Sequence, residues 1–190
     1  MNAYTWVETI SVCLSLAFLI LLMRNNKWCW PFGIVSSALS VVLFVHTKLY
    51  SEAILYVFYV LIGFYGWWIW SRKGKDGEEG VEIHLHSNRS RLLAFILGSA
   101  GAGLLGWWFN LYSDAARPFV DATTTSFSFV ASFLEAHKVF SAWIYWIIIN
   151  GVSVWLYFDR GLTIYSMLMV VYFGVSVYGW FDWKKKLKVV

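Results

Sequence analysis

The sequence predicts an all-α membrane protein with seven transmembrane helices, arranged as three helices, one linker helix and three helices. Three observations predict this fold. The chain of 190 residues is 59% hydrophobic and only 14% charged, with a mean hydropathy of +0.61. Its apolar runs are long enough to cross a bilayer, and short polar loops separate them. Its two halves also match each other at a constant offset.

Six apolar stretches have the length of about 20 residues that a bilayer core of about 30 Å requires. They cover residues 5–23, 28–46, 51–70, 91–112, 139–158 and 162–183. The first has no basic residue before it and contains Glu8, so we expect a retained helix, not a cleaved signal. A seventh stretch, 119–136, is ambiguous because it carries Asp121 and a run of hydroxyl residues at 123–126.

An internal repeat resolves the ambiguous stretch. Residues 65–70 (YGWWIW) match residues 178–183 (YGWFDW), an offset of 178 − 65 = 113. The same offset places Trp30 on Trp143 and Glu8 on Asp121 without gaps. Stretch 119–136 is therefore the partner of the first span, and we predict that it also crosses the membrane. Four helices separate the two starts, so both three-helix units have the same orientation, as in some small transporters.

This repeat divides the chain into three predicted parts. Residues 1–73 form the first three-helix repeat, residues 74–113 a polar loop and the linker helix, and residues 114–190 the second repeat with a basic tail. Seven spans also separate the basic residues. One side receives twelve of them, and the other side receives only Lys48, Arg117 and Arg160. The positive-inside rule then places the N-terminus outside and the C-terminus in the cytoplasm.

Motifs for enzymatic, metal or nucleotide chemistry lack the context they require. His84 and His86 have no further ligands in sequence, and Cys13 and Cys29 give neither a metal spacing nor a disulfide framework. The GAGLLG run at 101–106 follows no strand, so its small residues favour the close approach of another helix, which in a transporter can be a pairing between subunits through the linker helix. We therefore expect no enzyme, no cofactor, no metal and no nucleic-acid partner.

One helix carries a candidate binding face. Trp143, Trp146, Asn150 and Tyr157 stand at i, i+3, i+7 and i+14, which places all four within a sector of about 60°. Asn150 lies midway along its span, where an unpaired amide is costly, so it meets a substrate or another helix. Indole and phenol faces beside an amide suit a flat, cationic ring.

Carboxylates near the spans lie at their predicted outer ends. These residues are Glu8, Glu52, Asp121 and Asp159. Coupling to protons or Na⁺ commonly uses carboxylates buried within the membrane. Their absence from the middle of the spans favours uncoupled, downhill transport.

The spacing of Trp143, Trp146, Asn150, Tyr157 and Gly161 resembles the signature of PnuC-type nicotinamide riboside transporters. Residues 30–33 (WPFG), 49–52 (LYSE) and 65–70 resemble the first-half pattern of the same family. The resemblance implies a 3+1+3 fold related to the SWEET sugar transporters and a homotrimer with one substrate path per subunit. It also implies facilitated diffusion of nicotinamide riboside across the inner membrane, with a cytoplasmic kinase trapping the product, and a binding site lined by the first four of these residues.

One departure from the family pattern leaves the substrate open. Tyr56 stands where the first-half pattern places a Gln, a polar contact to the substrate. Thiamine or riboflavin therefore remain alternative substrates. Tyr56 and Tyr59 either complete the pocket or pack between the two triplets. Outside the transporter class, the alternatives are a membrane enzyme or sensor without flux, and a structural subunit that tolerates Asn150→Leu and Trp146→Ala.

Overall fold

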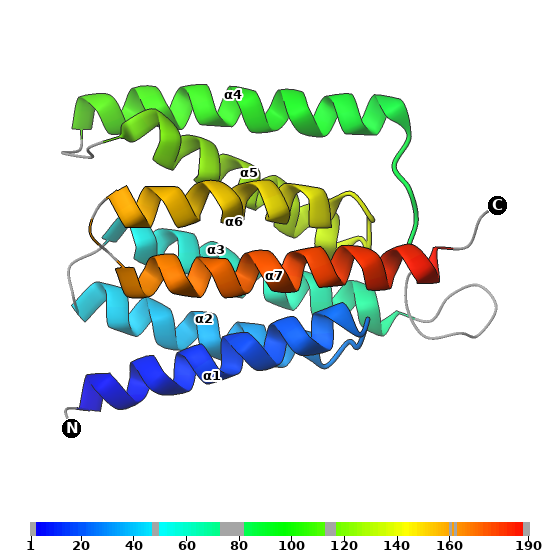
Figure 1. Cartoon of the computed structure of the whole chain (residues 1–190), viewed down its shortest axis with the longest axis horizontal. Helices are drawn as coiled ribbons and strands as arrows, with labels where there is room; N and C mark the ends of the chain where they lie inside the picture. Colours follow the sequence, from blue (N-terminus) through cyan, green and yellow to red (C-terminus); the bar gives the residue numbers. More distant parts are fainter. Residues whose placement is uncertain are drawn as a thin grey trace. The chain divides into compact units, whose positions relative to one another are not determined.

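The computed structural model describes residues 3–46, 50–72, 82–112, 117–159, 161 and 163–187. These residues form seven helices and one isolated β-bridge (Figure 1). The helices are α1 (Ala3–Met23), α2 (Cys29–His46), α3 (Tyr50–Ser71), α4 (Asn88–Tyr112), α5 (Pro118–Ala136), α6 (Ala142–Asp159) and α7 (Thr163–Lys186). They belong to two compact units: unit 1 is Met1–Glu82 with α1–α3, and unit 2 is Ile83–Val190 with α4–α7.

The all-helical class is confirmed, and each predicted span coincides with one helix. The ambiguous stretch 119–136 is the helix α5. Among the described residues, four helices are long and apolar enough to cross a membrane by length and composition, namely α1 to α4. The other three predicted spans stay a prediction.

Unit 1 is organised around α2, which packs against both α1 and α3. Serines fill the contact between α1 and α2: the hydroxyls of Ser11 and Ser40 are 2.7 Å apart, and those of Ser15 and Ser36 are 2.6 Å apart. Ser36 also donates to the backbone carbonyl of Ser11 at 2.9 Å. Small side chains let the two backbones approach closely, and their mutual hydrogen bonds satisfy hydroxyls that lipid cannot.

Unit 2 stacks its helices in the order α4, α5, α6 and α7, each packed on the next (Figure 1). Rings from α5 lie against glycines of α4, because Phe127 covers Gly98 and Phe119 covers Gly106. Ser126 donates to the carbonyl of Gly98 at 2.8 Å. The small residues predicted to allow a close helix approach therefore receive a helix of the same chain.

The turn between α1 and α2 has the same hydrogen bonds as the turn between α5 and α6. Asn25 and Lys138, which are 138 − 25 = 113 residues apart, both adopt left-handed backbone angles, with φ of 58° and 53°. Each donates at 2.9 Å to the carbonyl three residues earlier, in Leu22 and Glu135. The next residue in each turn donates to Leu21 or Leu134 at 3.0 or 2.9 Å. Both helices thus end in a Schellman motif.

A tryptophan–glycine contact also occurs at matching positions in the two units. In each unit, an indole from one helix lies against a glycine of the next helix and edge-on to a second indole. The ring centroids of the two indoles are 5.6 Å apart in unit 1 and 5.4 Å apart in unit 2. The residues are Trp30, Gly66 and Trp70 in unit 1 and Trp143, Gly179 and Trp183 in unit 2.

Candidate functional site

Trp146 and Asn150, one turn apart on α6, bond to opposite neighbours of that helix. The indole Nε1 of Trp146 donates to Oε2 of Glu135 on α5 at 2.7 Å. The amide Nδ2 of Asn150 donates to Oγ of Ser176 on α7 at 3.1 Å. Ser176 in turn donates to the carbonyl of Tyr172 at 2.8 Å. The amide donor of Asn150 is therefore engaged between helices.

Trp143 occupies a different position from Trp146. Its side chain is 2% exposed and packs against Gly179 and Trp183 of α7. Its Nε1 is buried, and within the described part of the chain it has no acceptor. The structure thus turns the indoles of Trp143 and Trp146 toward different helices, although the sequence places them on one face.

Tyr157 lies two turns beyond Asn150 on α6 and is half-buried. Gly161 follows the end of this helix with φ of 71°, a left-handed angle that glycine adopts without strain. The role of Tyr157 in a binding face with Trp146 and Asn150 stays a prediction.

Tyr56 and Tyr59 belong to unit 1 and lie together on α3. Their rings meet edge to face with centroids 5.5 Å apart, and Phe44 of α2 lies 5.1 Å from Tyr56. Both tyrosines are half-buried. Each therefore packs within its own unit and keeps part of its ring accessible.

Glu135 was not among the residues that the sequence singled out. Its side chain is 5% exposed in the last turn of α5, directly hydrogen-bonded to Trp146. Two features of the sequence could have found it. The offset of 113 aligns Glu135 with Leu22 (135 − 113 = 22), an apolar residue. Glu135 is also the sole acid between residues 122 and 158. Glu135 lies at the end of its predicted span opposite to the end that carries Asp121.

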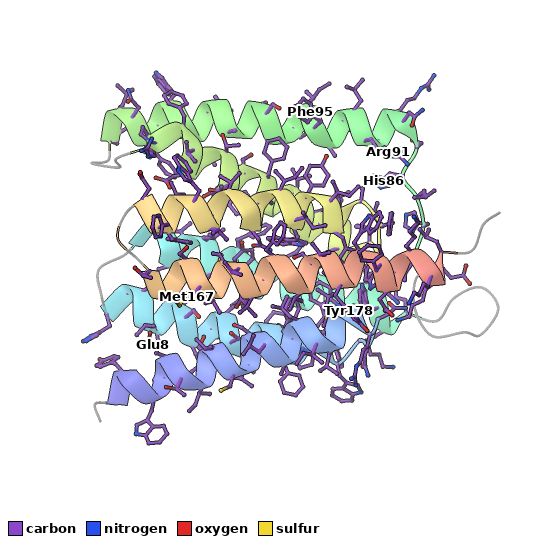
Figure 2. The ribbon with its side chains drawn as sticks, in the orientation of Figure 1. Glu8, His86, Arg91, Phe95, Met167 and Tyr178 are labelled. Atoms are coloured by element: carbon purple, nitrogen blue, oxygen red, sulfur yellow. The ribbon has the colours of Figure 1, made fainter. Side chains whose placement is uncertain are left out.

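A short segment before α4 docks on the turn between α5 and α6. His84 forms a parallel bridge with Val139, donating to the carbonyl of Lys138 at 3.2 Å and accepting from Phe140 at 3.0 Å. Burial lowers the pKa of His86, and the nearby His84, His137 and Arg91 lower it further. Figure 2 shows His86 and Arg91 at the same end of α4. Among the described residues, no three side chains are grouped to hold a metal ion.

These features define a multi-pass helical membrane protein. Its helices are long and apolar, hydroxyls pair between them, and α6 carries one amide among aromatic residues. The chain belongs to the nicotinamide mononucleotide transporter family, whose model matches residues 5–185. The resemblance noted from the sequence is thereby confirmed. The family consists of transporters, which also confirms that the chain is not an enzyme.

Characterised relatives cover nearly the whole chain. The nicotinamide riboside transporter PnuC of Neisseria mucosa is 26% identical over 98% of this chain and 75% of its own length. The riboflavin/roseoflavin transporter RibM of Streptomyces davaonensis is 26% identical over 94% of this chain and 84% of its own. The Escherichia coli PnuC is 23% identical over 92% of this chain and 83% of its own.

A solved structure shares the fold. The crystal structure of the vitamin B3 transporter PnuC superposes with a TM-score of 0.75 at 24% identity, covering 95% of this chain and 81% of that one. At this identity the likeness concerns the arrangement of the helices.

Proposed function

We propose that this protein mediates uptake of nicotinamide riboside by facilitated diffusion. The observation that carries the proposal is the face of α6 on which Trp146, Asn150 and Tyr157 follow one another, in a chain whose relatives include nicotinamide riboside transporters. An indole and a phenol attract a pyridinium ring through cation–π contact, at about 0.5–2 kcal/mol each. The carbonyl oxygen of Asn150 suits the carboxamide N–H groups, because its amide nitrogen already donates to Ser176.

Roles follow for the remaining predicted residues. Trp143 forms the packed base of the site, since its indole is held between α6 and α7. Tyr56 and Tyr59 contribute from the first half of the chain, and their half-buried rings support this role. Transport is downhill, and a cytoplasmic kinase that phosphorylates the riboside maintains the inward gradient.

We propose that the helices form two three-helix repeats of like orientation, SWEET-like, joined by α4. The matching Schellman turns and tryptophan–glycine contacts at an offset of 113 support this proposal (138 − 25 and 143 − 30). Rocking of the two triplets around the site would then give alternating access. The distribution of basic residues supports seven spans in an inner membrane, with the N-terminus outside and the C-terminus cytoplasmic. A homotrimer follows from the family resemblance.

Riboflavin is the second candidate substrate, because RibM is as similar to this chain as the Neisseria mucosa PnuC. Thiamine is a third, since Tyr56 replaces the expected polar contact and a thiazolium is also a flat cation. Neither needs a different fold. Riboflavin differs from the other two in carrying no positive charge, so charge is the property that separates it from them.

Uptake into proteoliposomes tests the proposal. Purified protein is reconstituted without any other component, and entry of labelled nicotinamide riboside is followed with unlabelled thiamine or riboflavin as competitor. We expect saturable uptake of the riboside that stops when inside and outside concentrations are equal. Uptake of thiamine or riboflavin with the riboside ignored would assign the other substrate. Absence of flux for all three, with folded protein, would favour a sensor or structural subunit.

A further inference from the structure

Among the described residues, Glu135 is a buried carboxyl group that bonds to an indole. Its side chain is 5% exposed, and one oxygen accepts the indole N–H of Trp146 at 2.7 Å. This donor is neutral, and among the described residues the ion pairs of Arg117 and Lys186 go to other acids, Asp159 and Asp182. A carboxylate has about four lone-pair sites, so one indole N–H leaves most of them unused. A buried charge in this state is strongly unfavourable, so the group takes up a proton unless a cation compensates it.

The fold does not require a carboxylate at this position. In unit 1 the same position of the same Schellman turn is Leu22, which is 1% exposed. The residue at the place of Trp146 is Gly33 (146 − 113), which the ring of Phe18 covers. Unit 2 therefore has a carboxylate and an indole bonded to each other where unit 1 packs an apolar side chain and a glycine.

The carboxylate is placed beside the candidate binding face. Trp146 lies one turn from Asn150 on α6, and Glu135 reaches it from α5, the neighbouring helix (Figure 1). A planar ring on the Trp146 indole would meet this carboxylate at the indole edge and the Asn150 amide one turn along. An anion accepting the indole N–H also makes the ring face more negative, which strengthens its attraction for a cation.

We propose that Glu135 is the counter-ion of the transported cation and selects a positively charged planar ring over a neutral one. This inference rests on the proposed function and deepens it by naming the residue that reads the charge. The substrate class is a flat heteroaromatic cation, such as a pyridinium or thiazolium. Neutral flavins and substrates carrying a phosphate would be disfavoured, since the first leaves Glu135 uncompensated and the second brings another negative charge beside it.

Two forms of one molecule provide the test. Nicotinamide riboside carries a pyridinium, and its reduced dihydro form has nearly the same shape and no ring charge. Initial uptake of both is measured in proteoliposomes containing wild type, Glu135→Gln or Glu135→Leu. Gln keeps an oxygen that accepts the Trp146 N–H, so it removes the charge and retains the contact. Leu reproduces the residue that the same turn carries in unit 1, which guards against misfolding as an explanation.

We expect wild type to prefer the cationic form and both variants to lose at least tenfold of that preference, about 1.4 kcal/mol. The loss should come from slower uptake of the cation, with uptake of the neutral form unchanged or faster. Trp146→Phe, which removes the N–H and keeps the carboxylate, should retain a preference for the cation.

Three results would overturn the proposal while leaving nicotinamide riboside transport intact. The first is equal uptake of both forms by wild type. The second is a Glu135→Gln protein with the wild-type preference, which would limit Glu135 to holding the indole. The third is accumulation driven by an imposed proton gradient in wild type and lost in Glu135→Gln, which would make Glu135 a proton carrier. Failure of wild type to transport either form would instead reject the proposed function.

Discussion

Arg117 and Asp159 form an ion pair of 2.8 Å that joins the start of α5 to the end of α6. The residues 113 positions earlier, Tyr4 and His46 (117 − 113 and 159 − 113), stack ring on ring with centroids 3.5 Å apart. The same two places are thus joined in both units, by an ion pair in one and by stacked rings in the other. The contact between these helix ends is retained while its chemistry differs.

This relationship predicts that the two contacts are interchangeable. Arg117→Tyr and Asp159→His should each lower stability by less than about 1 kcal/mol, because the pair is partly exposed. The double variant should be at least as stable as the less stable of the two single variants, since it recreates the ring pair of unit 1. Thermal unfolding of the purified protein in detergent measures all three. A double variant that loses the sum of the two single effects would contradict this prediction.

A second prediction concerns the contact between α6 and α7. A Cβ at Gly179 would collide with the indole of Trp143, so Gly179→Ala should destabilise the protein by about 1–3 kcal/mol through forced separation of the helices. Gly174→Ala on the same helix is the matched control. It meets no atom within 4 Å and should be neutral or slightly stabilising. Equal melting temperatures for the two variants would show that the indole moves aside without cost.

A third prediction separates the two roles of Asn150. Asn150→Leu should reduce nicotinamide riboside uptake at least tenfold, because the amide oxygen that we propose to contact the substrate is lost. Ser176→Ala removes the hydrogen-bond partner of Asn150 and leaves the amide, so it should lower stability by about 1 kcal/mol and retain most of the uptake. Initial uptake rates and melting temperatures are compared for both variants. Wild-type uptake by Asn150→Leu would mean that the amide serves only to join α6 to α7.

A fourth prediction concerns the pH dependence of the segment before α4, which docks on the turn between α5 and α6. Burial lowers the pKa values of His86 and His137 from 6.5, with His84 nearby opposing a second positive charge. A lowered pKa in the folded state means that folding favours the neutral rings. Docking of the segment is therefore fully stable above about pH 6.5 and weakens as the pH falls below that value.

Amide hydrogen exchange of residues 82–87 provides the measurement, at pH 7.5 and 5.5 after correction for intrinsic rates. The N–H of His84, which bonds to Lys138, should exchange faster at the lower pH. Replacing both His86 and His137 by Gln should remove most of this difference. Faster exchange at the higher pH would reverse the predicted sign.

The sequence was informative where local rules apply. Stretch 119–136 looked ambiguous because of Asp121 and its hydroxyl run, and the offset of 113 placed it correctly as a helix, α5. Thr123, Thr124 and Ser128 bond to the carbonyls of their own helix, which explains how polar residues are accommodated in it. Spacing along α6 likewise predicted which side chains share a side, and the binding role of that face stays a prediction.

Contacts between helices were harder to predict from the sequence. Trp143 and Trp146 belong to one face by spacing, yet one packs on α7 and the other bonds to α5. Asn150 was expected to meet either a substrate or a helix, and its amide nitrogen meets Ser176. Glu135 was overlooked because its importance comes from Trp146, a residue on another helix.

The sequence by itself determined the number of helices, their approximate bounds, the family and the equivalence of positions 113 apart, because helix length and periodicity are local properties. Only the tertiary structure decided that Glu135 lies at Trp146 and that Trp143 lies at Gly179. In a membrane helix, the side facing lipid and the side facing protein are both apolar, so hydropathy does not reveal how each helix is rotated about its axis. Packing of small residues and hydrogen bonds between helices set that rotation, and they appear only once the helices are brought together.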